Sequence, residues 1–419
     1  MTLQTSWVAS ANSAETDFPL NNLPYGVFST ETLDPRCGVA IGDMILDCRA
    51  AEDAGLIDIT SEPLFDVPFW NEVMEEGRAT WDALRARLTA ILTEGFSGEA
   101  LVTDLLVPRA DAQMHMPFLV AEYTDFYAGR QHAQNMGAIL RGSPSLPANW
   151  LHIPIGYNGR ASSVVVSGTP IHRPNGQTKA PDAEMPGFGP SKRLDIELEL
   201  GAIVGTGSDL GKPITVDEAD DMIFGYVLLN DWSARDIQGW EYQPLGPFQG
   251  KAFGTSISPW IVTTAALEQF RTPTPERDFT LLPYLDGSKD GLYDIELEVL
   301  IQPTGAPKAS SIAKTNYNHM YYSAAEQLAH HASSGCAMTP GDLLGSGTIS
   351  GADRSEFGSL MELGNGGKEP FTLETGETRG FLEDGDTVTL RGAAKGDGYK
   401  IGFGDCVGTI LPAVTWPSK

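Results

Sequence analysis

The stretch Gly225-Tyr-Val-Leu-Leu-Asn230-Asp231-Trp-Ser-Ala-Arg235-Asp-Ile-Gln238 joins an apolar run to a group of polar residues. The apolar run at 224–230 has the length and composition of a strand. Functional side chains commonly lie where a strand meets a loop, so Asp231 is a candidate site residue. An acid in this place also serves as a turn or helix-capping residue, and the stretch alone does not choose between the two interpretations.

Downstream and upstream of this stretch, short apolar runs alternate with Gly, Pro and Asp as far as the C-terminus. This alternation of apolar runs and turn residues is typical of strands joined by turns. The pattern predicts a large mixed or antiparallel β domain with one helix near 321–334 and strands near 163–167, 195–200, 224–230, 258–263, 294–301, 386–391 and 407–411.

The N-terminal part has a different pattern. Val39-Ala-Ile41 and Met44-Ile-Leu46 flank a Gly-Asp turn dipeptide, which predicts a hairpin. From Trp70 to Leu92 apolar residues recur at helical spacing, and Gly95 follows as a stop signal, which predicts one amphipathic helix. We place the domain boundary near 118, so that the domains are residues 1–118 and 119–419.

Composition limits the fold class. The chain has 419 residues, which is enough for two or three domains, and 41% of them are hydrophobic, which excludes a disordered chain. Its 46 glycines and 28 prolines follow no fixed period and favour a turn-rich protein. We therefore expect a mainly β (α+β) fold.

Charge and cysteine usage limit the partners and the compartment. Lys and Arg number 28 against 55 Asp and Glu, a net charge of −27, so nucleic acid and anionic membranes are not expected partners. The four cysteines form no CxxC pair, which disfavours a disulfide framework or a zinc-thiolate site. With no export or membrane signal in the sequence, we expect a cytoplasmic protein.

Several common catalytic motifs are absent from the sequence: the GxSxG elbow, the HExxH helix, the GxxxxGK[ST] phosphate loop and the GxGxxG fingerprint. The segment from Gly205 to Gly211 has one residue too many for the last of these. A serine hydrolase, a zincin and a nucleotide-binding enzyme are therefore disfavoured.

The pentapeptide Asp195-Ile-Glu-Leu-Glu199 places three acids on one face of an extended chain. A half-buried strand with its acidic face in water explains this pattern, and the copy at Asp294-Ile-Glu-Leu-Glu298 supports that simple interpretation. The alternative is an oxygen-ligand cation site, because neighbouring buried carboxylates repel one another unless a cation lies between them. Such a site needs further ligands, for which Asp125 and Asp231 are candidates, and would take a hard cation such as Mg²⁺, Ca²⁺ or Mn²⁺.

His132 lies close in sequence to an aromatic, acidic and basic group of residues. A lone histidine is more often structural, but an imidazole suits a general base at neutral pH if an acid orients it. The glycine-dense segments 246–258 and 344–351 allow close approach of the backbone to a ligand, or they are simply tight turns. Grouping Arg141, Arg235 and Lys251 with a cation would make a positive pocket for an anionic substrate.

Seven collinear segments are spread over nearly the whole chain: Asp17–Phe28, Tyr123–Tyr127, Arg130–Ala133, Gly159–Thr169, Asn230–Gln238, Pro244–Phe248 and Gly396–Gly404. Through these segments the chain resembles the fumarylacetoacetase family. Asn-Asp-Trp-Ser-Ala-Arg-Asp marks only the fold of the wider superfamily, whereas Arg-Gln-His-Ala and the stretch from Pro-Leu-Gly-Pro-Phe to Lys251 are more specific. The resemblance implies a small SH3-like β-barrel N-terminal domain, a larger β-roll catalytic domain and a homodimer.

The same resemblance implies roles for individual residues. The base is His132, with Glu362 as its orienting acid, and the second copy of the pentapeptide is structural. Where this chain has Asn158, the family pattern leads us to expect histidine. The implied metal ligands are Asp125, Glu197, Glu199 and Asp231, with Lys251 and Thr255 near a second cation; Arg235, Gln238 and Lys251 face the oxyanion; Tyr127, Arg141, Gln238, Tyr242 and Thr348 contact the substrate.

The implied activity is metal-dependent hydrolysis of the carbon–carbon bond of 4-fumarylacetoacetate to fumarate and acetoacetate, in tyrosine and phenylalanine catabolism. The substrate is a small anionic diketo acid, and the cofactor is Mg²⁺ and/or Ca²⁺. Alternatives on the same scaffold are an acylpyruvate hydrolase, an oxaloacetate decarboxylase and related hydratases. A non-catalytic, calcium-stabilised β domain is an alternative from another class.

Overall fold

A five-stranded antiparallel sheet organises the N-terminal part of the chain, and the computed structural model describes residues 2–417. The predicted hairpin is confirmed: β2 pairs with β3 around Gly42, whose φ of +59° suits a glycine in the turn. The strands of this sheet, in the order β4-β3-β2-β1-β5, are β1 (Tyr25–Ser29), β2 (Arg36–Ile41), β3 (Met44–Asp47), β4 (Leu106–Pro108) and β5 (Gln113–His115).

The single helix predicted from Trp70 to Leu92 is wrong, because two helices occupy this segment. They are α2 (Asn71–Glu75) and α3 (Arg78–Leu92). Gly77 separates them with a φ of +82°, which no residue inside a right-handed helix adopts. The apolar spacing continues through the break, so periodicity alone did not reveal it. Two short helices, α1 (Cys48–Asp53) and α4 (Glu99–Thr103), complete this part of the chain.

An eight-stranded sheet forms the centre of the rest of the molecule. Its two longest strands, β13 (Leu198–Val204) and β14 (Ile223–Asp231), pair antiparallel and are buried along their whole length. Such continuous burial requires cover on both faces of the sheet. The order is β7-β6-β22-β13-β14-β16-β8, with β17 beside β14, and the other strands are β6 (Tyr123–Phe126), β7 (Gly156–Asn158), β8 (Val164–Val166), β16 (Thr255–Ile257), β17 (Val262–Thr263) and β22 (Leu343–Gly345).

The strand predicted at 258–263 is displaced. The chain instead forms β16 before this segment and β17 at its end, and Pro259 lies between them. A proline has no N–H to donate to a central sheet, so it interrupts the run of apolar residues. The strand predicted at 195–200 is split, because β12 (Leu194–Asp195) ends before Ile196 and β13 begins at Leu198. The remaining predicted strands and the helix near 321–334, which is α10 (Ala324–Ala332), are present.

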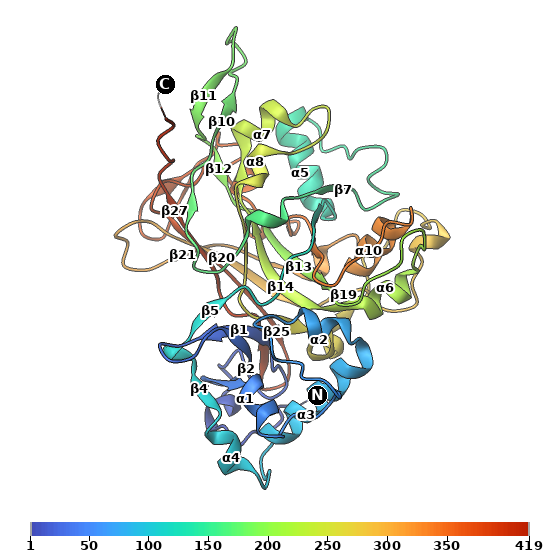
Figure 1. The fold of residues 1–419 in the computed structure, drawn as a ribbon. Helices are drawn as coiled ribbons and strands as arrows, with labels where there is room; N and C mark the ends of the chain where they lie inside the picture. The colour runs from blue at the N-terminus through green and yellow to red at the C-terminus, as the bar shows by residue number, and fades with distance from the viewer. Residues whose placement is uncertain (1, 418–419) are drawn as a thin grey trace.

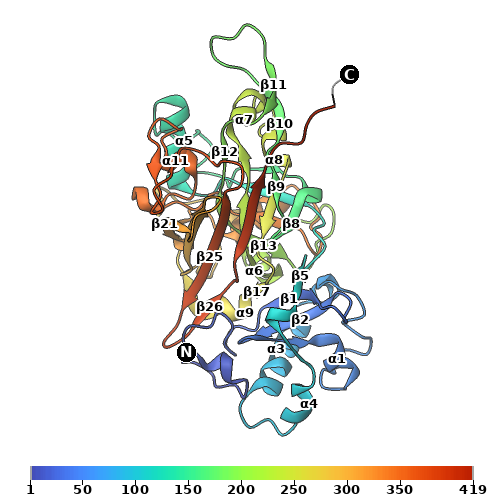
Figure 2. The same cartoon turned by 90° about the vertical axis from the view of Figure 1, so that its left-hand side faces the viewer.

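A second large sheet packs beside the first, as Figure 2 shows with β25 and β26. Leu228 of the central sheet shares one apolar core with Leu297 and Leu390 of this second sheet. Its order is β21-β20-β25-β27-β9, with β26 beside β25, and its strands are β9 (Ile171–His172), β20 (Glu296–Gln302), β21 (Ser310–Asn316), β25 (Thr387–Lys395), β26 (Lys400–Gly402) and β27 (Cys406–Leu411).

The N-terminal part packs against one face of the central sheet and shares a core with it (Figure 1). The ring centroids of Tyr25 and Phe224 are 5.8 Å apart, and those of Trp81 and Phe224 are 5.0 Å apart. A β-bridge between Tyr25 and Ile261 also joins the two parts. This cover buries the face of β14 that ends at Asp231.

Short elements surround the two large sheets, and together they make a mixed α+β fold. No helix within residues 2–417 combines the length and apolar character needed to cross a membrane. The helices are α5 (Arg130–Arg141), α6 (Val216–Met222), α7 (Arg235–Glu241), α8 (Gln249–Ala252), α9 (Thr264–Leu267) and α11 (Leu360–Leu363); the two-stranded pairs are β10 (Asn175–Thr178) with β11 (Gly187–Pro190), β12 (Leu194–Asp195) with β15 (Ser233–Ala234), β18 (Arg271–Thr272) with β19 (Leu292–Tyr293), and β23 (Phe371–Thr372) with β24 (Thr378–Arg379).

Candidate active site

Four acidic side chains meet at one end of the central sheet. Asp125 lies on β6, Glu199 on β13 and Asp231 at the end of β14, and Glu197 directly precedes β13. One oxygen from each of the four carboxylates lies within 4.8 Å of the others, and all four residues are at most 5% exposed. Segments that are far apart in the sequence therefore form one buried acidic cluster.

Strand alternation and a glycine make room for this cluster. Leu198 and Leu200 point into the core between the two large sheets, so Glu199 points to the opposite face. Gly345 lies on β22, the strand between β6 and β13. A Cβ at Gly345 would lie 2.9 Å from Asp125 Oδ1 and 3.0 Å from Glu199 Oε2, which is too close for ordinary packing. A residue with any side chain there would displace the two carboxylates.

The donor set fits a divalent cation. Asp125 Oδ1, Glu199 Oε1 and Asp231 Oδ1 are buried and have no hydrogen-bond partner among the described residues. Burial raises the pKa of all three carboxyl groups, and for Glu199 the neighbouring Asp125 and Asp231 raise the pKa further. Unpartnered carboxylate oxygens that face one another are what a hard, oxygen-preferring cation needs. The cluster is therefore a candidate metal-binding site.

Glu197 has different surroundings from the other three acids. Its Oε1 lies 2.7 Å from Arg235 Nη2, and its Oε2 contacts Lys251 Nζ, which also contacts Asp231. Burial raises the pKa of Glu197, but Arg235, Lys251 and His132 outweigh it and hold the pKa below its usual range. Burial lowers the pKa of Lys251, but Asp231 and Glu197 outweigh it and raise the pKa above its usual range. Glu197 and Lys251 are therefore both charged at neutral pH.

A histidine–carboxylate pair lies beside the cluster. His132 on α5 and Glu362 on α11 are both buried, and Nδ1 of the histidine is 2.7 Å from Oε2 of the glutamate. Its Nε2 points the other way and lies 3.6 Å from Glu197 Oε1. This orientation leaves Nε2 facing the acidic cluster, where it can accept a proton.

Glu362 is held firmly in place by further donors. Asn135 Nδ2, Ser359 Oγ and Ser350 Oγ donate to its carboxylate over 2.8, 2.7 and 3.1 Å. Burial raises the pKa of Glu362, but His132 and the hydrogen bonds from Asn135 and Ser359 outweigh it and hold the pKa below its usual range. An ionised Glu362 can accept the Nδ1–H of the histidine and thereby fix its tautomer.

Arg235 and Gln238 lie in the first turn of α7, next to Glu197. Arg235 Nη1 donates to Gln238 Oε1 over 3.2 Å, and its Nε donates to Asp195 Oδ2 over 2.8 Å. Asp195 also accepts from the backbone N–H groups of Leu360 and Met361 over 2.7 and 3.0 Å. It therefore joins the arginine to the start of α11, the helix that carries Glu362.

Comparison with known proteins identifies the family. Residues 21–117 match the family model described as "Fumarylacetoacetase N-terminal", and residues 122–411 match "Fumarylacetoacetate (FAA) hydrolase C-terminal". The chain is 48% identical over 412 residues to the fumarylacetoacetase of Rattus norvegicus, covering 96% of this chain and 98% of the relative. It is 48% identical over 412 residues to that of Arabidopsis thaliana, covering 96% and 97%. This chain belongs to the fumarylacetoacetase family.

Solved structures share the fold at much lower sequence identity. The fumarylacetoacetate hydrolase of Exiguobacterium antarcticum is 18% identical, with a TM-score of 0.53, and covers 93% of this chain and 99% of that chain. The structure of Cg1458 with inhibitor is 16% identical, with a TM-score of 0.53, and covers 93% and 100%. These two similarities extend the fold of the fumarylacetoacetase family beyond its closely related sequences.

The residues that the fumarylacetoacetase resemblance assigns to substrate contact differ in burial and in their partners. Tyr127 packs edge-to-face against His132 with ring centroids 5.5 Å apart, and Thr348 is buried with its hydroxyl unpartnered among the described residues. Arg141 is exposed and donates to the carbonyl of Ser145, and its charge, like that of the buried Arg235, acts to lower the pKa of Tyr127, which burial raises overall. Tyr242 follows α7 and is 48% exposed.

A cavity of about 240 Å³ gives access to the cluster and is lined by Tyr157, Asn158, Phe248, Asp231 and Lys251, among others. Asn158, where histidine was expected, pairs with Thr124 across β6 and β7. Thr255 pairs with Asp231 across β14 and β16 and is buried.

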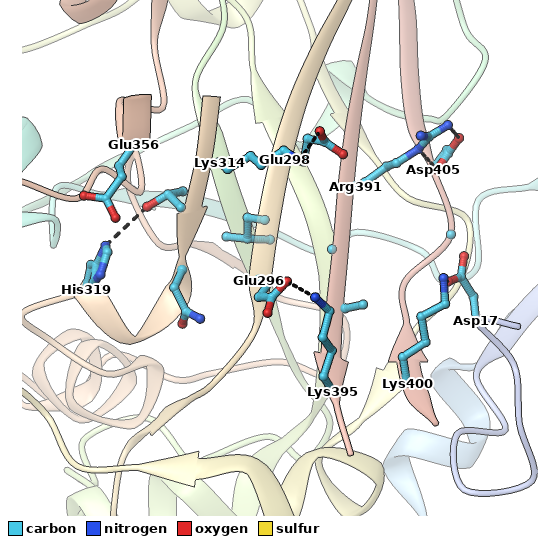
Figure 3. Close-up of a pocket in the computed structure, with 16 residues that line it drawn as sticks. Asp17, Glu296, Glu298, Lys314, His319, Glu356, Arg391, Lys395, Lys400 and Asp405 are labelled. Carbon is cyan, nitrogen blue, oxygen red and sulfur yellow. Dashed lines mark hydrogen bonds and ion pairs between the residues drawn. The ribbon is translucent and has the colours of Figure 1, made fainter. Parts of the chain in front are cut away.

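The second copy of the pentapeptide has different surroundings from those of the first copy. Glu296 and Glu298 are on β20 and line a groove of about 740 Å³ together with charged residues of β21 and β25 (Figure 3). Each pairs with a lysine, Lys395 over 2.5 Å and Lys314 over 3.3 Å. Within the described residues, neither glutamate joins the four-carboxylate cluster.

Sequence reasoning missed several residues that shape the site. Asp195 was noted as an acid on the same strand face but was given no role, although it anchors Arg235. Asn135, Ser350 and Ser359, which hold Glu362, have no sequence motif that marks them. The one available signal for Asn135 is its spacing from His132, since residues three apart share a helix face.

Proposed function

We propose that this chain hydrolyses the carbon–carbon bond of 4-fumarylacetoacetate, giving fumarate and acetoacetate in the catabolism of tyrosine and phenylalanine. The observation that carries the proposal is the His132–Glu362 pair, whose free nitrogen faces a buried four-carboxylate cluster. The curated relatives at 48% identity over 96% of this chain carry the name fumarylacetoacetase.

The reaction places two demands on the site. Water must lose a proton as it attacks a carbonyl carbon, and the carbon fragment that leaves must be stabilised as an enolate. His132 Nε2 takes the proton from water, while Glu362 holds Nδ1 and stabilises the imidazolium that forms. Asp125, Glu197, Glu199 and Asp231 would hold a divalent cation, which would supply Lewis-acid chemistry to the reaction.

Arg235, Gln238 and Lys251 stabilise the negative oxygen that develops at the attacked carbonyl. All three have partners in the substrate-free protein: Asp195 holds Arg235, Arg235 holds Gln238, and Glu197 and Asp231 hold Lys251. Removal of one such donor typically raises the barrier by about 3–4 kcal/mol. Tyr127, Arg141, Gln238, Tyr242 and Thr348 bind and orient the substrate, with the arginine directed to a carboxylate.

The cation is Mg²⁺ or Ca²⁺, because all four ligands are carboxylates and neither thiolate nor imidazole belongs to the set. A backbone or hydroxyl oxygen near Lys251 and Thr255 would hold a second cation, since an ammonium group cannot ligate one. The ammonium of Lys251 contacts two carboxylates, which supports its role as a fixed positive charge.

The functional protein is a cytoplasmic homodimer of two-domain chains, with an SH3-like barrel at 1–118 and a catalytic β-roll at 119–419. The arm formed by β10 and β11 projects from the body of the molecule in both views (Figures 1 and 2). Phe188 on this arm and Trp416 beside it are 54% and 67% exposed, and their ring centroids lie 5.0 Å apart. Exposed aromatic side chains of this kind support contact with a second copy.

A spectrophotometric assay tests the proposed function. We expect the absorbance of fumarylacetoacetate to fall on incubation with the protein and Mg²⁺ or Ca²⁺, and a chelator to stop the loss. Acylpyruvates and oxaloacetate serve as parallel substrates, and faster turnover of one of these would replace the proposal with that activity. A non-catalytic, calcium-stabilised domain gives no absorbance loss with any of them.

A further inference from the structure

The side chain of Tyr123 ends at the carboxylate cluster. It begins β6, two residues before Asp125, and is 3% exposed. A Cβ on Gly345 would lie 3.2 Å from Tyr123 Oη, as well as 2.9 Å from Asp125 Oδ1 and 3.0 Å from Glu199 Oε2. The phenol oxygen and two carboxylate oxygens therefore converge on the space that the missing side chain leaves open.

The ring of Tyr123 is held from the other side by a second glycine. The N–H of Gly159 donates to the carbonyl of Tyr123 over 2.7 Å. A Cβ on Gly159 would lie 2.3 Å from Tyr123 Cδ1 and 2.7 Å from its Cε1. The ring also belongs to the apolar core that the central sheet shares with the N-terminal part. Backbone and core together thus direct the hydroxyl toward the carboxylates.

A buried phenol normally finds a hydrogen-bond partner. The hydroxyl of Tyr123 has none among the described residues, as is also true of Asp125 Oδ1, Glu199 Oε1 and Asp231 Oδ1, whereas Glu199 Oε2 accepts from the N–H of Gly347 over 2.9 Å. A phenol can donate its proton to a carboxylate and can accept one from water. The hydroxyl can therefore supply a hydrogen-bond donor to a group of carboxylate oxygens that lack one.

We propose that Tyr123 is a positioning residue of the metal site, held between Gly159 and Gly345 so that its hydroxyl orients the carboxylates that bind the cation. The inference rests on the metal site of the proposed function. Hydrogen bonds from outside the ligand set fix the direction of ligating carboxylates, and their loss typically weakens metal binding by about 10–100-fold. Through its ring, Tyr123 also connects the core of the N-terminal part to the ligands.

The test compares Tyr123→Phe with Tyr293→Phe. Both changes remove one hydroxyl and keep the ring, and Tyr293 is a matched control because its hydroxyl is also buried and unpartnered among the described residues but lies on β19. Calorimetric titration of the substrate-free protein with Mg²⁺ and with Ca²⁺ gives Kd directly. We expect Tyr123→Phe to raise Kd about 10–100-fold and Tyr293→Phe to change it less than twofold. Equal changes in the two variants would overturn the proposal.

Gly159→Ala tests the same geometry without touching a polar group. The added methyl group displaces the ring of Tyr123, so we expect a Kd increase similar to that of Tyr123→Phe and no further increase in the double variant. Additive effects would show that the two residues act separately and would contradict the inference. The thermal transition of the metal-free variants, followed by circular dichroism, confirms that each is folded when it is titrated.

The outcomes separate this inference from the proposed function. If the wild-type protein binds cations but does not hydrolyse fumarylacetoacetate, the proposed activity is wrong and the inferred role of Tyr123 still stands. If Tyr123→Phe hydrolyses fumarylacetoacetate normally and binds cations with unchanged affinity, only the inferred role of Tyr123 is wrong. Wild-type protein that binds neither Mg²⁺ nor Ca²⁺ overturns both.

Discussion

The pentapeptide Asp-Ile-Glu-Leu-Glu occurs twice in this chain, at 195–199 and at 294–298, in very different surroundings. In the first copy Asp195 and Glu199 are 0% exposed and Glu197 is 5% exposed. In the second, the side chains of Glu296 and Glu298 are 56% and 26% exposed. The same five residues are thus part of a buried acidic cluster in one place and part of a solvated sheet face in the other.

The position of each strand in its sheet explains the difference. The first copy runs into β13, which lies between β22 and β14 in a sheet covered on both faces. The second copy runs into β20, whose residues alternate between buried and open positions, and the open side faces the groove of Figure 3. Tertiary cover, rather than local sequence, therefore decides whether these acids face water or one another.

Burial changes the partners that each acid requires. Glu197 has two buried cations, Arg235 and Lys251, whereas Glu296 has one exposed lysine. A buried carboxylate without a compensating charge is strongly unfavourable, so the first copy needs cations that the second does without. If this comparison is correct, substitutions in the first copy and its neighbours must have large effects and those in the second small ones.

The largest effect is expected for His132→Ala, which removes the group that contacts the first copy at Glu197. Turnover of fumarylacetoacetate should fall at least about 10³-fold, because the change removes the nitrogen that faces the cluster as a proton acceptor. Fold and bound metal should remain, since Glu362 keeps its hydrogen bonds from Asn135, Ser350 and Ser359. Steady-state kinetics and metal analysis of the purified variant measure both. Loss of metal would make His132 a ligand and contradict its assignment as the base.

Glu199→Gln and Glu298→Gln compare the last position of each copy. Glu199→Gln removes a negative charge from the cluster, so Mg²⁺ or Ca²⁺ should bind at least about tenfold more weakly. Glu298→Gln should leave cation affinity unchanged, because its partners are Lys314 and Ser311 on β21. Calorimetric titration of both variants measures the difference. Equal weakening would mean that the assignment of the two copies is wrong.

A smaller effect is the pH dependence of stabilisation by the cation. Burial raises the pKa of Asp125, Glu199 and Asp231, so the metal-free fold holds protons that the unfolded chain releases above about pH 4. The metal-free protein therefore loses stability as pH rises toward these raised pKa values, whereas bound cation replaces the protons. At a concentration 100 times Kd, cation should add about 2.7 kcal/mol.

The measurement is the difference in Tm with and without Mg²⁺ from pH 5 to pH 8. We expect the difference to widen as pH rises, to persist in Glu298→Gln and to shrink in Glu199→Gln. A difference that grows toward acid pH would contradict the raised pKa values of the cluster.

Most strands and the face of the first pentapeptide could be predicted from the sequence, because alternation and turn residues are local signals. The break between α2 and α3 at Gly77 and the interruption at Pro259 could not, since the apolar spacing continues through both. His132 and Glu362 are 230 residues apart, and no local sequence pattern predicts that they pair. Only the family resemblance predicted the pair.

Local sequence patterns also could not show which of the two pentapeptide copies belongs to the acidic cluster. Alternation placed the acids of both copies on one face, but which face is buried depends on distant segments such as β22 and the N-terminal part. Asp195 was overlooked for a related reason. Its partners, Arg235 and the first turn of α11, come from elsewhere in the chain.

The smallest effect is expected for Glu296→Gln. The carboxylate lies 2.5 Å from Lys395 Nζ, but the two side chains are 56% and 63% exposed, so water screens their attraction. Denaturant unfolding should show a change in stability below about 0.5 kcal/mol, and a cycle with Lys395→Met should give a coupling of the same size that vanishes in 1 M salt, where the screening length is about 3 Å. A loss of several kcal/mol would show that the second copy also depends on its charge, and the contrast between the buried and the exposed pentapeptide would then fail.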